Sequence, residues 1–446
     1  MTVLSTLFAP QALLADGWAR DVRIEIAPEG NIASIEQDAS PGGCERIEGV
    51  VVPGLTDLHS HAFERALAGL RRPLRGLLAR IGPDELRAIA GQLYVELLKG
   101  GYTGAVEFHH LHHPPGGGRY DDPALLAVML HEAARDAGIG LTLLPALCMR
   151  GGFDGAPLEG HARRFALQPA ELVAMLGRLE RLFADDPERQ LGVAVHSLGA
   201  VPPERLAELV EAATRGMPAG PLHIHLAARP EEVEDCLACY GRRPLRLLAE
   251  AVPLGPRWCL VHATHLDEDE RSLLAASGAV AGRCPTSEAS RGDGIFILEP
   301  FLARGGRFGI GSDHNLCSEA AHELRLLDYG QRLAMRRCPA AVDGSGPQCG
   351  AALFMGALRG GAQASARPVG RLAPGFRADL LVLDDSHPAL CGREGDLLLD
   401  ALVLASRGQP VRHVMVSGDW RIRDGAHLAE DAIGTAFRAA MRRLGA

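Results

Sequence analysis

With 446 residues, the chain is long enough to bury a large core, and we expect one large domain with a smaller one beside it. Apolar residues make up 47% and charged residues 23%, which is ordinary for a globular protein, while the formal net charge of −9 argues against a basic nucleic-acid-binding surface. No apolar segment approaches membrane-spanning length, and no basic region precedes the apolar residues near Met1. We therefore expect a cytoplasmic protein whose ten scattered cysteines are reduced thiols.

The first 52 residues are predicted to form short β-strands. Apolar segments of strand type occur at residues 2–8, 22–26 and 32–35 and in the run that ends at Val52. Turn residues such as Pro28-Glu29-Gly30-Asn31 separate them, and no helical period of useful length is present. This part of the chain is therefore expected to belong to a small β domain.

From residue 53 to residue 366, eight apolar runs alternate with amphipathic helical segments. The runs are residues 51–61, 104–110, 140–148, 191–198, 221–228, 258–265, 280–287 and 308–313. Strands that are apolar along their whole length suit a parallel sheet covered by helices. Eight such units predict an α/β fold of the TIM type, a (β/α)8 barrel with its functional residues at the C-terminal ends of the strands.

After residue 366 the chain returns to β character, with strand-like runs at residues 378–383 and 411–416. We expect these strands to complete the N-terminal ones. Residues 1–52 and 367–446 would then form one small β-sandwich domain from both chain ends, closed by a helix over residues 428–443. Residues 53–366 would form the barrel.

Polar residues collect at the ends of the predicted barrel strands. His59 and His61 are two residues apart on strand one, so their side chains point the same way. The other such residues are His196 on strand four, His223 and His225 on strand five, His262 and His265 on strand six, and Asp313 and His314 on strand eight. Because these ends converge at one mouth of the barrel, we favour a shared metal site over separate core histidines.

Two motifs give the chain a resemblance to the metal-dependent amidohydrolase superfamily. Residues 53–61, PGLTDLHSH, match its first motif, and residues 370–380, GRLAPGFRADL, match its last. Within the superfamily the chain most resembles the N-formimidoyl-L-glutamate deiminases, through stretches such as residues 93–103, 260–265 and 292–296. The resemblance implies a hydrolase in which metal-activated water attacks an amidine or imine carbon and ammonia leaves.

The same resemblance implies roles for individual residues. One divalent metal ion, expected to be Zn²⁺, would be bound by His59, His61, His225 and Asp313. His262 would orient the water or polarise the substrate, and Asp313 would also accept the proton of the water. Contacts to a small-molecule substrate are expected from His196 and Tyr120. No lysine ends strand four, which favours one metal over two, and a homodimer is expected from the resemblance alone.

The chain departs from the family pattern in the expected pocket. Ala228 stands where the family has a proton-shuttling Glu, Glu64 where it has Gln, and Gly199 where it has an Arg that would clamp a carboxylate. A carboxylate relocated to Glu64 could serve in catalysis and substrate binding; the alternative is a set of unrelated substitutions.

Residues 313–315 read Asp-His-Asn instead of Asp-Ser-His, and His314 could replace the shifted histidine. The basic segment Arg71-Arg72-Pro73-Leu74-Arg75 could contact an anion or be a solvated loop.

These departures leave three functions open. The first is a deiminase with changed substrate specificity; the second is a non-hydrolytic lyase or cyclase that uses the metal as a Lewis acid; the third is a catalytically impaired binding homologue. A further cluster, HHLHH at residues 109–113, could suggest a second metal site, but a packing or pocket-wall role is the preferred interpretation.

Overall fold

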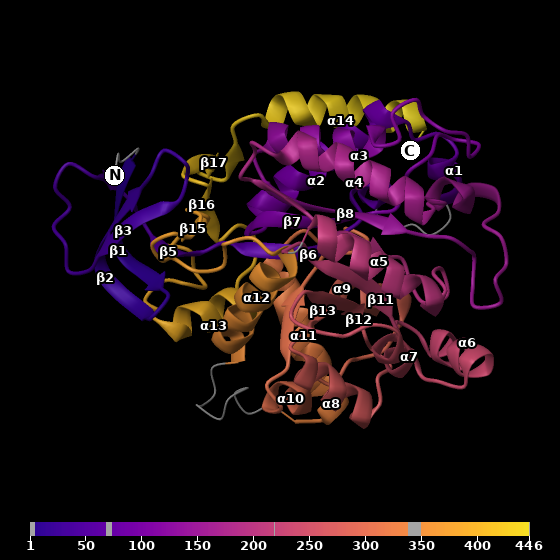
Figure 1. The fold of residues 1–446 in the computed structure, drawn as a ribbon. Coiled ribbons are helices and arrows are strands. Elements are labelled where there is room, and N and C mark those ends of the chain that lie inside the picture. Colours follow the sequence, from indigo (N-terminus) through magenta and orange to yellow (C-terminus); the bar gives the residue numbers. More distant parts are fainter. Residues whose placement is uncertain (1–4, 68–73, 218, 338–348, 446) are drawn as a thin grey trace.

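The computed structural model describes residues 5–67, 74–217, 219–337 and 349–445. Its centre is a barrel of eight parallel strands, each paired with the next one along the chain (Figure 1). The strands are β6 (Leu55–Ser60), β7 (Tyr102–His109), β8 (Gly140–Leu147), β10 (Val193–Val195), β11 (Leu222–Leu226), β12 (Trp258–His262), β13 (Val280–Arg283) and β14 (Arg307–Ile310). A parallel bridge between Ser60 and Asp313 joins the last strand to the first. The predicted TIM-type barrel is confirmed.

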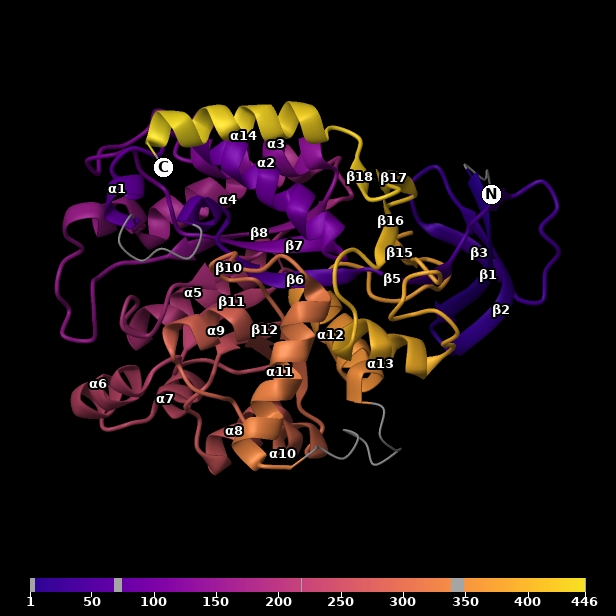
Figure 2. The same ribbon diagram turned by 180° about the vertical axis from the view of Figure 1, so that it is seen from behind.

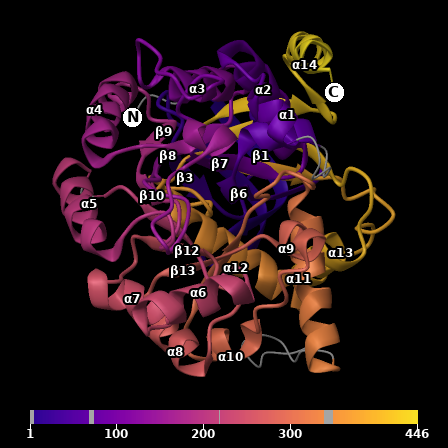
Figure 3. The same cartoon turned by 90° about the vertical axis from the view of Figure 1, so that its right-hand side faces the viewer.

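Helices surround the strands on the outside, as the view along the barrel shows (Figure 3). They are α2 (Pro83–Lys99), α3 (Leu125–Ala137), α4 (Pro169–Phe183), α5 (Pro203–Gly216), α6 (Pro230–Tyr240), α7 (Pro244–Ala251), α8 (Glu268–Ser277), α9 (Pro285–Arg291), α10 (Leu298–Ala303), α11 (Ala320–Met335) and α12 (Cys349–Ser365). Many begin with proline, whose fixed φ suits the first helical position. The remaining short elements are η1 (Ala62–Leu67), α1 (Leu74–Leu78), η2 (Gly160–Phe165) and β9 (Arg189–Leu191), which pairs with β8. None of the described helices combines the length and hydropathy that crossing a bilayer requires.

Both chain ends build the small β domain, as expected, and its strands lie together on one side of the barrel (Figures 1 and 2). They are β1 (Ser5–Leu14), β2 (Gly17–Ile26), β3 (Ile32–Glu36), β4 (Glu45–Arg46), β5 (Val50–Pro53), β15 (Leu380–Leu383), β16 (Val411–Val416), β17 (Asp419–Arg423) and β18 (Ala426–His427). β5 pairs with β1 on one side and with β15 on the other, so one continuous sheet joins the two ends. The division at residues 52/53 and 366/367 stays a prediction.

Two helices follow β15. α13 (Asp396–Leu404), which the sequence pattern did not suggest, packs against α12, and α14 (Glu430–Leu444) lies over α2 as the predicted closing helix (Figure 2). α14 therefore ties the end of the chain back to the barrel.

The N-terminal ends of the barrel strands form a floor that faces the small β domain, because β5 leads directly into β6. A group of ions, the floor cluster, joins the two: the buried Arg367, Arg377 and Asp379 and the partly buried Glu188. Arg367 Nη2 lies 2.6 Å from Glu188 Oε2, and Arg377 binds the other oxygen of the same carboxylate. A side chain at Gly140 would overlap the Arg367 guanidinium, so glycine at the start of β8 leaves room for this ion.

Candidate metal centre and catalytic cavity

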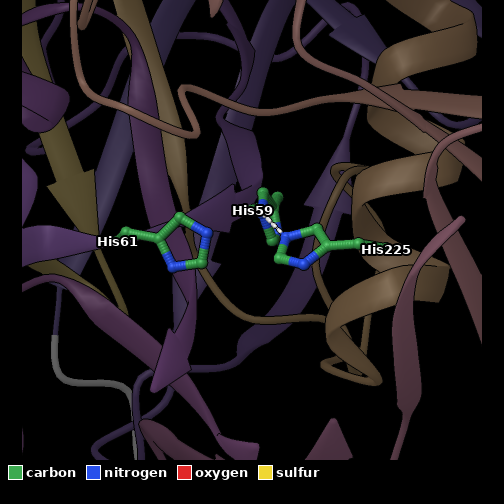
Figure 4. Close-up of side chains that lie close together, drawn as sticks. All are labelled: His59, His61 and His225. Atoms are coloured by element: carbon green, nitrogen blue, oxygen red, sulfur yellow. Dashed lines mark hydrogen bonds between the residues drawn. The ribbon is translucent and has the colours of Figure 1, made fainter. Parts of the chain in front are cut away.

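Three imidazoles meet at the C-terminal mouth of the barrel (Figure 4). Their Nε2 atoms converge: His59 Nε2 lies 3.0 Å from His225 Nε2, and Asp313 Oδ1 lies 3.7 Å from His59 Nε2 and 3.6 Å from His61 Nε2. Ligands about 2.0 Å from a tetrahedral Zn²⁺ are separated from one another by about 3.3 Å. The four side chains that the family resemblance implies as ligands are therefore spaced as the donors of one metal ion would be.

Hydrogen bonds hold two of the three imidazoles, those of His61 and His225, in the tautomer that leaves Nε2 free to bind a metal. His61 Nδ1 donates to the carbonyl of Phe108 over 3.0 Å, and His225 Nδ1 donates to the carbonyl of His196 over 2.9 Å. Each ring therefore keeps the lone pair of its Nε2 for a ligand. Burial lowers the pKa of His61 to about 3 and the pKa values of His59 and His225 well below the usual range, so all three rings are neutral at pH 7.

Asp313 is surrounded by positive or donor groups. Burial alone would raise its pKa, but the charges of His314, His262 and Arg291 lower that pKa well below the usual value, so the carboxylate is ionised. Arg291 Nη1 donates to Asp313 Oδ2 over 2.7 Å. His262 Nε2 lies 3.7 Å from the same oxygen, while its Nδ1 donates to Glu288 Oε1 over 3.2 Å. One oxygen of Asp313 thus faces the imidazoles of His59 and His61 and the other faces His262.

The backbone at the mouth is locally strained. Positive φ angles occur at Ala227 (46°), His262 (69°), Ala263 (50°), Asp313 (50°) and Asn315 (56°), each of which follows or ends a barrel strand. Residues other than glycine adopt this conformation at a cost, and such residues cluster at functional sites.

Further polar contacts compensate for this cost by joining β6 to the loop after β14. Asn315 Nδ2 donates to the carbonyl of His61 over 2.7 Å, and Asp57 accepts the N–H groups of His59 and Ser312. Burial raises the pKa of Asp57 to about 7 although these donors oppose it.

A cavity of about 560 Å³ opens beside the imidazoles. His61, His225, His262 and Asp313 line it together with His196, His314 and Glu64. Burial lowers the pKa of His196 to about 4, so that ring is neutral. Burial, reinforced by the charge of Asp313, raises the pKa of Glu64 to about 8, and Glu64 Oε2 lies 3.6 Å from His314 Nε2. Glu64 and His314 therefore share one wall.

The charged cavity residues missed by the sequence reasoning include Arg150, Glu232 and Arg291. Arg150 follows β8 by three residues, Glu232 lies in the first turn of α6, and Arg291 ends α9. Their positions in the sequence could have identified them, because each follows a barrel strand and so lies near the C-terminal mouth. Histidine and aspartate drew attention as ligands, whereas arginine and glutamate beside them resemble ordinary surface residues.

Other expected residues lie elsewhere. Tyr120 is half-buried against the hydrophobic core and does not line the cavity. Gly199 and Ala228 line it without contributing a polar side chain. Arg71, Arg72 and Pro73 lie outside the described residues, as do the side chains of Leu74 and Arg75.

The HHLHH cluster has a packing arrangement. His110 Nδ1, His112 Nε2 and His113 Nε2 contact the backbone carbonyls of Phe108, Ala146 and Ala166 at 3.3, 3.1 and 2.7 Å. Within the described part of the chain, none of the cluster's histidines belongs to a group of convergent metal donors. The geometry supports the packing interpretation.

Comparison with known proteins adds to this picture. A model of the amidohydrolase family matches residues 50–421, and a model of the N-terminal domain of formimidoylglutamate deiminase HutF matches residues 4–49. The formimidoylglutamate deiminase of Pseudomonas aeruginosa is 46% identical over 97% of this chain and 98% of its own length. The crystal structure of an amidohydrolase from Brucella melitensis matches with a TM-score of 0.91 at 39% identity, covering 99% of this chain and 100% of its own. An adenosine deaminase from Xanthomonas campestris shares the fold, with a TM-score of 0.82 at 20% identity over 99% and 98% of the two chains.

The motifs at residues 53–61 and 370–380 had suggested this kinship, and the matches over nearly the whole chain confirm it. Convergent imidazoles, an ionised aspartate and the barrel that carries them agree with it in detail. The chain belongs to the amidohydrolase family and is a metal-dependent hydrolase of the deiminase type, acting on C–N bonds.

Proposed function

We propose that the protein hydrolyses the C–N bond of an amidine or imine with one Zn²⁺ held by His59, His61, His225 and Asp313. The convergence of these four side chains carries the proposal. Three imidazoles and one carboxylate leave a position for water, and the related fold from Xanthomonas campestris is described with bound zinc. When bound, the ion lowers the pKa of a coordinated water to about 7.

The residues around this centre have separate tasks in the proposed reaction. Asp313 accepts a proton from the water, and its ionised state, which Arg291 supports, suits a base. His262 orients the water or the substrate through Nε2, which accepts a hydrogen bond from Arg291 Nη2 over 3.2 Å in this structure while Nδ1 donates to Glu288. His196 and Glu64 contact the substrate from two sides of the cavity. Glu64 is also one of the carboxylates available for proton transfer.

The substrate is proposed to carry an anionic group. Arg150 lines the cavity, where its Nε donates to the carbonyl of Gly199 over 2.9 Å and its Nη2 donates to Tyr240 Oη over 3.0 Å. These two hydrogen bonds hold the guanidinium at the cavity wall, where it could pair with an anionic group of a substrate. Because this arginine approaches from β8 and residue 228 carries no carboxylate, we propose a substrate different from the formimidoylglutamate for which the Pseudomonas aeruginosa relative is named.

An assay of ammonia release tests the proposal. Zinc-loaded protein would be offered formimidoylglutamate, shorter N-formimidoyl amino acids and uncharged formamidines in ¹⁸O-labelled water, with Asp313→Asn as the inactive control. We expect ammonia and one ¹⁸O atom in the product, with a shorter acid preferred. Product without ¹⁸O would instead support a lyase or cyclase, and formimidoylglutamate as the best substrate would contradict the changed specificity.

We further propose a cytoplasmic homodimer that binds neither nucleic acid nor membrane. The net charge of −9 and the family resemblance support this assignment. Sedimentation equilibrium of the purified protein tests it, and a monomer at micromolar concentration would contradict it.

A further inference from the structure

Glu232 is a partly buried residue of the cavity wall whose carboxylate has one unused oxygen. Its Oε2 accepts the N–H of Ala228 over 2.9 Å. Its Oε1 is buried and has no hydrogen-bond partner among the described residues. Such a buried acceptor costs free energy unless a ligand supplies the missing donor. The cavity is the space from which that donor can come, because Glu232 is one of its lining residues.

The local backbone holds Glu232 in this position. β11 ends at Leu226, and the positive φ of Ala227 turns the chain so that the Ala228 N–H faces the carboxylate. Glu232 itself sits in the first turn of α6, after Pro230. His225 and Glu232 therefore project from the two ends of one short strand–loop–helix segment into the same cavity.

The charges around Glu232 suit a group that alternates between its acid and its base form. Burial raises its pKa, while the facing N–H groups and the charges of His262 and Arg229 partly oppose that shift. Glu64, on the wall it shares with His314, already has an imidazole nitrogen 3.6 Å from its Oε2. Glu64 and Glu232 thus differ: Glu64 has a nearby imidazole, and Glu232 has an oxygen without a hydrogen-bond partner.

We propose that Glu232 is the catalytic carboxylate that binds an N–H of the departing nitrogen and transfers the proton that lets it leave. This inference rests on the proposed amidine or imine hydrolysis. It leaves Glu64 as a residue that binds the substrate.

The proton balance of the step is complete without another reactant. An amidinium R–NH–CH=NH₂⁺ and one water give R–NH–CHO, NH₃ and H⁺. The water oxygen bonds to the carbon, and the first proton of the water passes to Glu232 and then to the nitrogen. The C–N bond breaks as the C=O bond forms, and the second proton of the water passes to Asp313.

The test compares Glu232→Gln with Glu64→Gln, with Glu234→Gln as a matched control. Glu234 is exposed on the same helix and does not line the cavity. General acid–base catalysis contributes about 10²- to 10⁴-fold, so we expect Glu232→Gln to lower kcat on the best amidine by that factor with little change in KM. Glu64→Gln should mainly raise KM, and Glu234→Gln should match the wild type.

A second substrate separates proton transfer from a structural role. A thioimidate of the same skeleton expels a thiolate, which needs no proton to leave. On it, Glu232→Gln should lose less than about tenfold, with wild-type zinc content and melting temperature. Equal losses on both substrates, or full activity of Glu232→Gln on the amidine, would overturn the inference while the proposed function stands. A wild-type protein that releases no ammonia from any amidine would overturn both.

Discussion

The two ends of the barrel both bury polar groups, but they satisfy them differently. At the floor, Glu188 is shared by Arg367 and Arg377, and Arg367 Nη1 lies 3.8 Å from Asp379. Floor atoms that lack a hydrogen bond, such as Arg367 Nη1 and Asp379 Oδ2, still lie close to an opposite charge, whereas at the mouth Glu232 Oε1 has neither a hydrogen bond nor an ion pair within the described residues. The ion pairs at the floor connect the barrel to the small β domain, whereas polar groups without a partner at the mouth can bind a metal ion or a substrate.

The largest expected effect is the loss of a mouth imidazole. His225→Ala removes one of four proposed donors, so zinc content should fall from about one equivalent towards zero. A bound metal contributes several kcal/mol to the transition state, so kcat/KM should fall by at least about 10³. Metal analysis and the ammonia assay measure both, and a variant that keeps its zinc and its rate would contradict the proposed ligand set.

At the floor, we expect a change in stability instead of chemistry. Glu188→Gln leaves two buried arginines with a single acid, and breaking a buried ion pair costs about 3 kcal/mol. Urea unfolding should show this loss, while kcat/KM of the folded variant stays at the wild-type value. Glu48→Gln, which breaks an exposed pair with Arg412, is the control and should cost less than about 1 kcal/mol. If Glu188→Gln kept its stability and lost its activity, the expected difference between floor and mouth would be wrong.

Within the mouth, Arg150→Ala should change recognition without changing the chemistry. A hydrogen bond to a charged group contributes about 1.5–3 kcal/mol, so KM for an anionic amidine should rise about 10- to 100-fold. KM for an uncharged formamidine should not change. Steady-state kinetics with both substrates decides this, and Arg181→Ala, on the exposed face of α4, serves as the control. Equal effects on both substrates would exclude an anion-binding role.

Glu323 is a buried carboxyl group whose hydrogen bonds all come from the protein, so we expect its replacement to change stability. It lies in the first turn of α11, where Thr286 donates backbone and side-chain hydrogen bonds to it, and burial raises its pKa to about 8. Between the unfolded pKa of 4.5 and the folded one, only the folded state keeps the proton, so stability falls as pH rises. In Glu323→Gln this contribution, about 1.4 kcal/mol per pH unit, disappears. Unfolding free energies from pH 5 to 7.5 should therefore fall less steeply in the variant than in the wild type, and parallel curves would contradict the expectation.

The smallest effect is expected at Tyr120. The sequence reasoning placed it in the substrate site, but its side chain packs against the core and does not line the cavity. Tyr120→Phe should change kcat and KM by less than about twofold, as is usual for substitutions without a contact to the reacting groups. A large rise in KM would restore the substrate role.

Local sequence pattern predicted the barrel because each strand is apolar along its length and each helix is amphipathic. The same pattern gathered the strand-end histidines and Asp313 at one mouth, because the C-terminal ends of parallel strands meet at the same end of a closed barrel. The family resemblance then selected His59, His61, His225 and Asp313 from that group. These predictions needed no knowledge of loop conformation.

Tertiary structure alone decided which arginines and carboxylates reach the same space. Arg150, Glu232 and Arg291 enter the cavity through loops and helix ends whose directions depend on left-handed residues such as Ala227 and on contacts across the barrel. The floor cluster likewise joins Glu188 to arginines 179 and 189 positions away in the sequence. Side-chain periodicity is a local property that a single segment carries, whereas the pairing or exposure of a charge depends on every segment that packs around it.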